Sequence, residues 1–259
     1  MTLRPLTIAI SLKMYLRPAA TLDWLRRLVA MARDHPAVTT GAVDLIALPS
    51  HPMLASAVTE VRGTPILIGA QNAHWERSGA YTGEVSPLDL RDLGVRVVEL
   101  GHAERRRLFG ETDRDVAAKV IAAVSCGLTP LICVGEPEQG DPVAAADITV
   151  RQLASCLEGA RSAGVRSGVI VAYEPVWAIG RDDPATPDHI HAVTSAIEEW
   201  LDLEDDFRGS RVIYGGSAGP GILSLISASV DGLFLGRYAH DVQAVRAILD
   251  EALELPISR

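Results

Sequence analysis

The chain has 259 residues, 48% of them hydrophobic, and a formal net charge of −9. This length and apolar content suit one large core, and a single β/α-barrel domain commonly takes such a length. The acidic balance, with no basic run beyond Arg105-Arg106-Arg107, argues against nucleic acid as a partner. The sequence holds no apolar run long enough to cross a membrane, which argues against a membrane partner as well.

The N-terminal segment and the cysteines indicate a cytoplasmic protein. Residues 1–16 run from a short apolar stretch into Lys13 without a small-residue cleavage site, which predicts a first strand rather than a signal peptide. Cys126, Cys133 and Cys156 are an odd number without metal-ligand spacing. We therefore expect free, buried thiols in a reducing compartment, and no metal site.

Short apolar runs alternate with longer amphipathic stretches along the whole chain. The apolar runs predict strands at 6–10, 44–48, 66–70, 95–100, 131–134, 169–173, 211–214 and 232–235. The amphipathic stretches predict helices at 21–34, 52–61, 87–93, 114–126, 144–163, 187–203, 220–229 and 242–253. Eight β/α units predict one α/β barrel domain over residues 1–259. An open doubly wound sheet is the alternative, although no GxGxxG follows the first predicted strand.

Polar residues and glycines follow the predicted strands, where a barrel places its functional face. They are Ser11, Lys13, Gln71, Asn72, His74, His102, Glu136, Glu174, Gly215-Gly216-Ser217 and Gly236-Arg237. Because parallel strands end at one rim, we expect these residues to gather there.

The stretch Tyr173-Glu174-Pro175-Val176-Trp177-Ala178-Ile179-Gly180 places one carboxylate at a strand end, before a loop too apolar to be fully solvated. A carboxylate beneath a closing apolar loop loses water and becomes a better general base. The alternative is a buried loop whose glutamate serves a structural network.

His102 and Lys13 supply the groups that could face this base. A short helix beginning at Ala103 would disfavour a charged imidazole, so neutral His102 could donate a hydrogen bond to a substrate oxygen. A capping or core histidine is the alternative. Only two of the 24 basic residues are lysines, which suggests that Lys13 stands where arginine does not fit. Glu104 is the expected partner that holds Lys13, with an ordinary surface ion pair as the alternative.

Gly215-Gly216-Ser217 and Gly236 follow the seventh and eighth predicted strands, where barrels commonly bind phosphate. Glycines there allow backbone N–H groups to approach an anion, although such a short motif alone is usually a turn. A base, an electrophile, a cation and an anion site together suit proton abstraction next to the carbonyl of a phosphorylated substrate.

The sequence resembles the triosephosphate isomerase family nearly from end to end. The resemblance is carried, in order, by Ser11-Leu12-Lys13-Met14, Gln71-Asn72, Gly79-Ala80-Tyr81-Thr82-Gly83-Glu84, Gly101-His102-Ala103-Glu104-Arg105-Arg106, Cys133-Val134-Gly135-Glu136, residues 172–180 and Tyr214-Gly215-Gly216-Ser217. It implies a TIM barrel, a cytoplasmic homodimer, no cofactor, and an aldose–ketose isomerase that acts on a small sugar phosphate through an enediolate, of the type found in glycolysis and gluconeogenesis.

The resemblance also implies roles for single residues. Glu174 would be the proton-shuttling base, His102 the electrophile and Lys13 the electrostatic anchor. Backbone N–H groups of Gly180, Ser217, Gly236 and Arg237 would hold phosphate. Supporting roles would fall to Ile179 and Phe234 against Glu174, to Trp177 at Glu136, to Tyr214 near Ala185, and to Thr82, whose loop would enter the partner subunit over its Met14.

Several departures from the family pattern surround the expected substrate. Ser11 and Leu12 stand where the family has Asn and Trp, and Ala103 replaces a serine. The exit of the loop reads Arg181-Asp182-Asp183 in place of Thr-Gly-Lys. Arg237 replaces a glycine, and Phe234 a leucine. The resemblance favours triose phosphate as substrate; these changes make a four-carbon tetrulose phosphate the alternative, and a non-catalytic sugar-phosphate-binding barrel is a third hypothesis.

Overall fold

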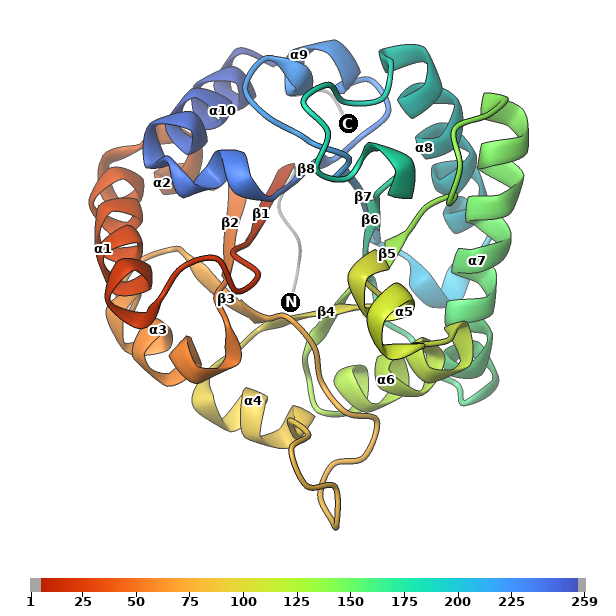
Figure 1. Cartoon of the computed structure of the whole chain (residues 1–259), viewed down its shortest axis with the longest axis horizontal. Helices are drawn as coiled ribbons and strands as arrows, with labels where there is room; N and C mark the ends of the chain where they lie inside the picture. The colour runs from red at the N-terminus through yellow and green to blue at the C-terminus, as the bar shows by residue number, and fades with distance from the viewer. Residues whose placement is uncertain (1–5, 256–259) are drawn as a thin grey trace.

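A computed structural model describes residues 6–255, which form a closed barrel of eight parallel strands in the order β1 to β8 (Figure 1). The first four strands are β1 (Leu6–Ser11), β2 (Val43–Leu48), β3 (Leu67–Ala70) and β4 (Val97–Leu100). The second four are β5 (Thr129–Val134), β6 (Ile170–Tyr173), β7 (Arg211–Tyr214) and β8 (Gly232–Leu235). Strand β8 pairs with β1, which closes the barrel and confirms the predicted architecture.

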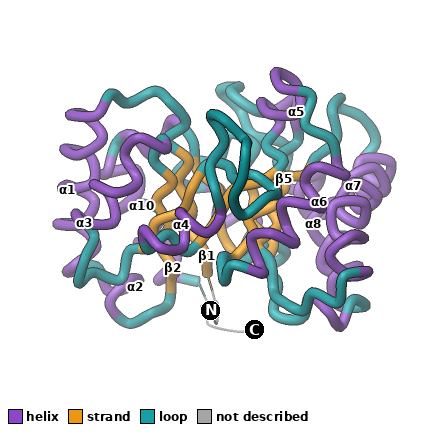
Figure 2. Tube along the Cα trace, turned by 90° about the horizontal axis from the view of Figure 1, so that it is seen from below, coloured by secondary structure: helices purple, strands orange, loops and turns teal. Residues whose placement is uncertain are grey.

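Helices surround the strands on the outside (Figure 2). They are α1 (Pro18–Asp34), α2 (Pro36–Thr39), α3 (Leu54–Glu60), α4 (Pro87–Leu93), α5 (Ala103–Phe109), α6 (Asp113–Ser125), α7 (Pro142–Ser162), α8 (Pro187–Asp202), α9 (Ile222–Ile226) and α10 (Val242–Glu254). Short 3-10 turns are η1 (His51–Met53), η2 (Val176–Ala178), η3 (Asp205–Phe207) and η4 (Arg237–His240). No helix of the described segment is long and apolar enough to span a membrane.

The predicted strands and helices are present, but the short helix α2 was not predicted and two of the predicted helices are shortened or divided. The helix predicted over 52–61 is divided into η1, a 3-10 turn that contains Pro52, and α3, which begins at Leu54. The helix predicted over 220–229 is reduced to α9, since Gly221 adopts a left-handed φ of 91° immediately before it. The prediction of one domain covers residues 1–259, of which 1–5 and 256–259 lie outside the described residues.

The core has two layers, which follow from the alternation of side chains along each strand. One cluster fills the barrel and contains Ala9, Ile46, Leu48, Val97, Leu131, Cys133, Ile170, Ala172, Ile213 and Phe234. The other lies between strands and helices, where parallel strands are covered by amphipathic helices. Since all strands run in one direction, their carboxyl ends and the following loops gather at one end of the barrel.

Closure of the barrel depends on Gly232, which pairs with Thr7 across the seam between β8 and β1. Its φ is 144°, and a Cβ at this position would lie 1.9 Å from the carbonyl oxygen of Thr7. We expect Gly232→Ala to lower the free energy of unfolding by about 3 kcal/mol, because the seam must open to relieve the clash. Urea unfolding followed by circular dichroism measures this loss.

Gly63→Ala is the matched control. Gly63 also has a positive φ, of 76°, but no atom lies within 4 Å of its added Cβ. Its loss should be about 1 kcal/mol, from backbone strain alone. Equal losses for the two variants would contradict a steric role for Gly232.

Candidate active site

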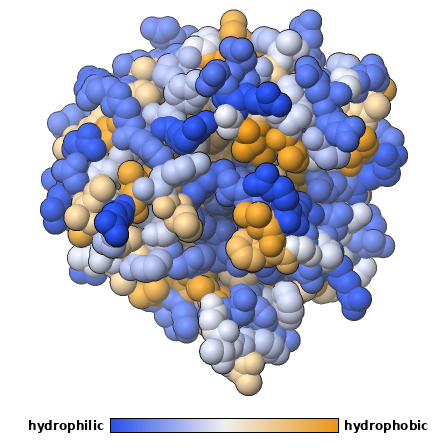
Figure 3. All heavy atoms as spheres, viewed as in Figure 1, coloured by the Kyte–Doolittle hydropathy of each residue, from blue (hydrophilic) through white to orange (hydrophobic). Residues whose placement is uncertain are grey.

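The loops at the carboxyl ends of the strands enclose a pocket of about 610 Å³. Figure 3 shows a hollow over the centre of this face, with polar and apolar surface mixed around it. Eleven of the twelve residues expected in the site line it: Ser11, Lys13, His102, Glu104, Glu174, Ile179, Gly180, Ser217, Phe234, Gly236 and Arg237. The barrel therefore brings together residues separated by more than 200 positions in the sequence.

Thr82 is the predicted site residue that does not line the pocket. It is exposed on the loop between β3 and α4, which extends away from the barrel (Figure 1). Its predicted role involves a partner subunit, so it stays a prediction.

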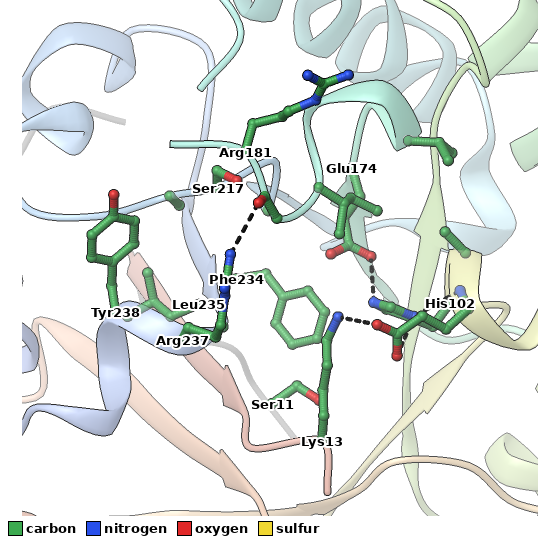
Figure 4. A pocket seen from close by; sticks show the side chains of 18 of the residues that line it. Ser11, Lys13, His102, Glu174, Arg181, Ser217, Phe234, Leu235, Arg237 and Tyr238 are labelled. Carbon is green, nitrogen blue, oxygen red and sulfur yellow. Dashed lines mark hydrogen bonds and ion pairs between the residues drawn. The ribbon is translucent and has the colours of Figure 1, made fainter. Parts of the chain in front are cut away.

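His102 is held by the helix that follows it. The helix α5 begins at Ala103, as predicted, and the backbone N–H of Glu104 donates to Nδ1 of His102 at 3.1 Å. A neutral ring that accepts at Nδ1 carries its proton on Nε2. That atom is buried without a hydrogen-bond partner and lies 3.6 Å from Oε2 of Glu174, which also lacks a partner (Figure 4). His102 thus has an unused donor that points at the site.

Glu174 follows β6 directly, and the chain around it fixes its position. Its backbone N–H donates to the carbonyl of Val134 at 2.8 Å. A Cβ at Gly215 would lie 2.7 Å from Cγ of Glu174, so only glycine leaves room for this side chain. Glu174 is 5% exposed, which places a carboxylate with an unpaired oxygen at the wall of the pocket.

Lys13 provides a fixed positive charge. Its Nζ donates to Oε1 of Glu104 at 2.8 Å, the contact expected from the sequence, and Gln71 Nε2 donates to its backbone oxygen at 2.9 Å. Burial lowers the pKa of Lys13, but the carboxylates of Glu174 and Glu104 outweigh it and leave the pKa above its ordinary value. Lys13 is therefore charged at neutral pH and oriented from both ends.

Lys13 and Ser217 also share an uncommon backbone conformation. They are the non-glycine residues with positive φ in the described chain, at 47° and 60°. Such conformations cost roughly 1–3 kcal/mol each and persist where surrounding contacts enforce them, often at functional sites. Ser217 is held in part by its hydroxyl, which donates to the carbonyl of Ala178 at 2.7 Å.

The loop after Glu174 is tied to its surroundings by contacts that the resemblance predicted. Trp177 Nε1 donates to Glu136 Oε1 at 2.7 Å, and the N–H of Ala185 donates to the Tyr214 hydroxyl at 3.0 Å. Tyr173 and His189 also contact Glu136. The loop is therefore anchored at its start and at its end.

Arg237 adds a contact that the sequence did not reveal. Its guanidinium donates to the carbonyl of Gly180 at 3.0 Å, across the mouth of the pocket (Figure 4). Tyr238 donates to the carbonyl of Asp182 at 3.4 Å. Two neighbouring side chains of η4 thus hold the exit of the apolar loop, 57 and 56 residues away in sequence.

Glu99 is a residue of the site that sequence reasoning missed. It lies on β4, is 3% exposed, and accepts a hydrogen bond from the Ser11 hydroxyl at 2.9 Å. The sequence did contain a signal for this position. Glu99 is a single carboxylate in an otherwise apolar strand, and it stands two positions after Val97, so both side chains face the barrel interior. No group of three or more His, Cys, Asp or Glu side chains within residues 6–255 is arranged to hold a metal ion.

The fold and the site define a class of protein: a β/α barrel with a glutamate and a histidine facing each other, a lysine and glycine-rich turns at one pocket. The family model described as triosephosphate isomerase matches residues 6–252. The chain belongs to the triosephosphate isomerase family.

Individual relatives carry two different names. The L-erythrulose-1-phosphate isomerase of Pectobacterium atrosepticum is 46% identical over 98% of this chain and 98% of its own length. The L-erythrulose-1-phosphate isomerase of Rhizobium etli is 41% identical over 80% of this chain and 79% of its own. The triosephosphate isomerase of Caldanaerobacter subterraneus subsp. tengcongensis is 36% identical over 90% of this chain and 93% of its own.

The packing of Gly215 against Glu174 gives a test of the site geometry. We expect Gly215→Ala to displace the carboxylate and to lower kcat about 100-fold, because an error of about 1 Å in a reacting group costs that much. Steady-state kinetics on a small ketose phosphate measures the effect. Gly140→Ala, where no atom lies within 4 Å of the added Cβ, should keep wild-type kcat. A normal kcat for Gly215→Ala would show that Glu174 tolerates displacement.

Proposed function

We propose that this protein isomerises a small sugar phosphate by moving its carbonyl group to the neighbouring carbon through an enediolate. The observation that carries the proposal is the pair of buried atoms without partners, Nε2 of His102 and Oε2 of Glu174, 3.6 Å apart. Burying two such groups unsatisfied costs free energy, which is expected where a substrate completes the hydrogen bonds. Lys13 lies beside them with its charge fixed by Glu104.

Each proton in this mechanism has a defined path. Glu174 takes a proton from the carbon next to the carbonyl, and the electron pair moves to the carbonyl oxygen. His102 donates a hydrogen bond from Nε2 to the enediolate, and the charge of Lys13 stabilises it. A proton moves between the two oxygens, and Glu174 returns its proton to the former carbonyl carbon, so no net oxidation occurs.

Phosphate would bind at the opposite side of the pocket. Gly180, Ser217, Gly236 and Arg237 line that side, and their backbone N–H groups suit an anion. The Arg237 guanidinium donates to the Gly180 carbonyl, so its side chain would act on the substrate through the loop as well as through its charge.

We infer that L-erythrulose 1-phosphate is the favoured substrate, with triose phosphate second. A tetrulose 1-phosphate carries a hydroxymethyl group on the carbon that loses its proton, and this group needs room. Ser11 and Ala103, both smaller than the residues usual in the family, line the pocket. The 46% identical relative named L-erythrulose-1-phosphate isomerase supports this choice, whereas the relative named triosephosphate isomerase supports the second.

A substrate panel tests the proposed isomerase activity and the proposed order of substrates. We expect kcat/KM for L-erythrulose 1-phosphate to exceed that for dihydroxyacetone phosphate at least tenfold, since specificity is a difference in transition-state binding. Glu174→Gln should lower kcat by roughly 10²–10⁴-fold on either substrate. Glu138→Gln, an exposed carboxylate distant from the base in sequence, is the matched control and should leave kcat unchanged.

Three outcomes of the panel would count against these proposals. A higher kcat/KM for dihydroxyacetone phosphate would reverse the order of substrates and would favour a role in glycolysis and gluconeogenesis. Unchanged turnover by Glu174→Gln would remove Glu174 as the base. Phosphate binding without turnover of any three- to five-carbon ketose phosphate would favour the non-catalytic barrel.

We further propose that the protein is a cytoplasmic homodimer. The free, buried Cys126, Cys133 and Cys156 fit a reducing compartment. Met14 is 91% exposed, and Trp75 and Tyr81 on the loop between β3 and α4 are 41% and 42% exposed. Apolar side chains exposed in this way suit a surface that a second copy covers.

Sedimentation measures the proposed dimer directly. We expect twice the 27.6 kDa chain mass for the wild type, and the chain mass for Thr82→Arg, because a guanidinium at the loop tip would be buried unpaired. The kcat of Thr82→Arg should fall roughly tenfold or more, as the loop supports the partner's site. Ser155→Arg, exposed on α7, should remain dimeric. A dimer for both variants would exclude this interface.

A further inference from the structure

Glu99 occupies a position that a barrel normally fills with an apolar side chain. Residues alternate along β4, so Glu99 faces the interior together with Val97, and β5 sets Leu131 opposite it. Interiors of such barrels are packed with layers of bulky apolar residues. A buried carboxyl group in this layer costs free energy unless its contacts or its function compensate.

The contact of Glu99 with the pocket runs through Ser11. Ser11 lines the pocket beside Lys13 (Figure 4), and its hydroxyl lies 2.9 Å from Oε2 of Glu99. Glu99 itself is not among the residues that line the pocket. Any effect of Glu99 on a substrate is therefore transmitted by the Ser11 hydroxyl or by charge.

The surroundings make Glu99 harder to ionise. Burial raises the pKa of Glu99 to about 7, and the negative charge of Glu174 acts in the same direction, whereas His102, the Ser11 hydrogen bond and Lys13 partly oppose it. The titratable groups that face it are Lys13 after β1, His102 after β4, Cys133 on β5 and Glu174 after β6. Burial also raises the pKa of the Cys133 thiol, so this group is neutral.

The protonation state of Glu99 decides which way the Ser11 hydroxyl points. An ionised carboxylate only accepts, so it takes the Ser11 proton and leaves an oxygen lone pair towards the pocket. A neutral carboxylic acid can donate to Ser11 Oγ, which frees the Ser11 O–H to donate into the pocket. Only the second arrangement suits an oxygen that becomes negative in the enediolate.

We propose that Glu99 is a positioning residue that works as a neutral carboxylic acid and, through Ser11, presents a hydrogen-bond donor to the reacting oxygens of the substrate. The proposal rests on the proposed function and adds a residue to it. Ionised Glu99 would withdraw this donor and would place another negative charge beside Glu174 and the enediolate. The enzyme is therefore active with Glu99 protonated and loses activity as Glu99 ionises.

The pH dependence of kcat/KM for L-erythrulose 1-phosphate tests the proposal, with wild type and Glu99→Gln compared. Below neutrality Glu99 is protonated, so the wild-type value should fall roughly tenfold or more between pH 6.5 and 8.5. The glutamine amide donates to Ser11 at every pH and does not ionise, so kcat/KM of Glu99→Gln should change less than twofold between pH 6.5 and 8.5. The same fall in both proteins would overturn the proposal.

The kcat profile supplies a second readout. A bound phosphate dianion adds negative charge and holds Glu99 protonated to higher pH, so the fall in kcat should begin at higher pH than the fall in kcat/KM. A purely structural role of Glu99 would lower activity by the same factor at every pH. A constant factor between wild type and Glu99→Gln would therefore also overturn the proposal.

Thermal unfolding measures the ionisation of Glu99 independently of activity, which matters if Glu99→Gln alters the fold. Because the folded-state pKa is raised, wild-type stability falls as pH rises from about 4.5 to about 7. The Tm of Glu99→Gln should thus exceed that of wild type by a margin that widens over this range. A margin that does not change with pH would show that Glu99 ionises normally.

Ser11→Ala provides the second variant. It retains Glu99 but removes the hydroxyl, so kcat should be lower than in wild type. The decrease of kcat/KM between pH 6.5 and 8.5 should also be smaller. If kcat/KM of Ser11→Ala decreased between pH 6.5 and 8.5 as much as that of wild type, Glu99 would not act through Ser11. Glu174→Gln separates this inference from the proposed function. Normal turnover by Glu174→Gln would contradict the proposed mechanism, whereas a negative result for Glu99 alone would leave the proposed function unaffected.

Discussion

The hydrogen bond from the backbone N–H of Glu104 to Nδ1 of His102 organises the site. It caps α5, fixes the proton of a neutral imidazole on Nε2, and directs that atom towards Glu174. The same residue, Glu104, holds Lys13 through its carboxylate. One short turn after β4 therefore positions both His102, the proposed electrophile, and Lys13.

Glu174 and the loop that follows it come from other parts of the barrel. Glu174, the proposed base, follows β6, and Gly215, which directly follows β7, leaves room for its side chain. The loop that follows is anchored through Trp177 and Tyr214, and Arg237 holds its exit. These contacts join the loop to segments that follow other strands. Hydrogen bonds from Gln71 to the backbone of Lys13 and from Ser217 to Ala178 likewise hold the two positive-φ residues beside the pocket.

The departures from the family pattern have a common setting. Ser11, Ala103 and Arg237 line the pocket, whereas Glu174, His102 and Lys13 keep the residue types that the family's chemistry uses. Ser11 donates a hydrogen bond to Glu99, so one of these positions in the pocket is linked to a buried carboxyl group in the barrel interior.

The sequence alone determined the eight β/α units and the chemical groups at the strand ends, because apolar periodicity and turn residues act over short distances. The helices at 52–61 and 220–229 were predicted too long, since the 3-10 turn His51–Met53 and the left-handed φ of Gly221 are local backbone conformations that periodicity does not report. Only the tertiary structure decided that Glu99 meets Ser11, 88 residues away, and that Arg237 reaches Gly180. Those contacts depend on strand register and barrel closure, which place side chains from remote segments within hydrogen-bonding distance and leave no local pattern in the sequence.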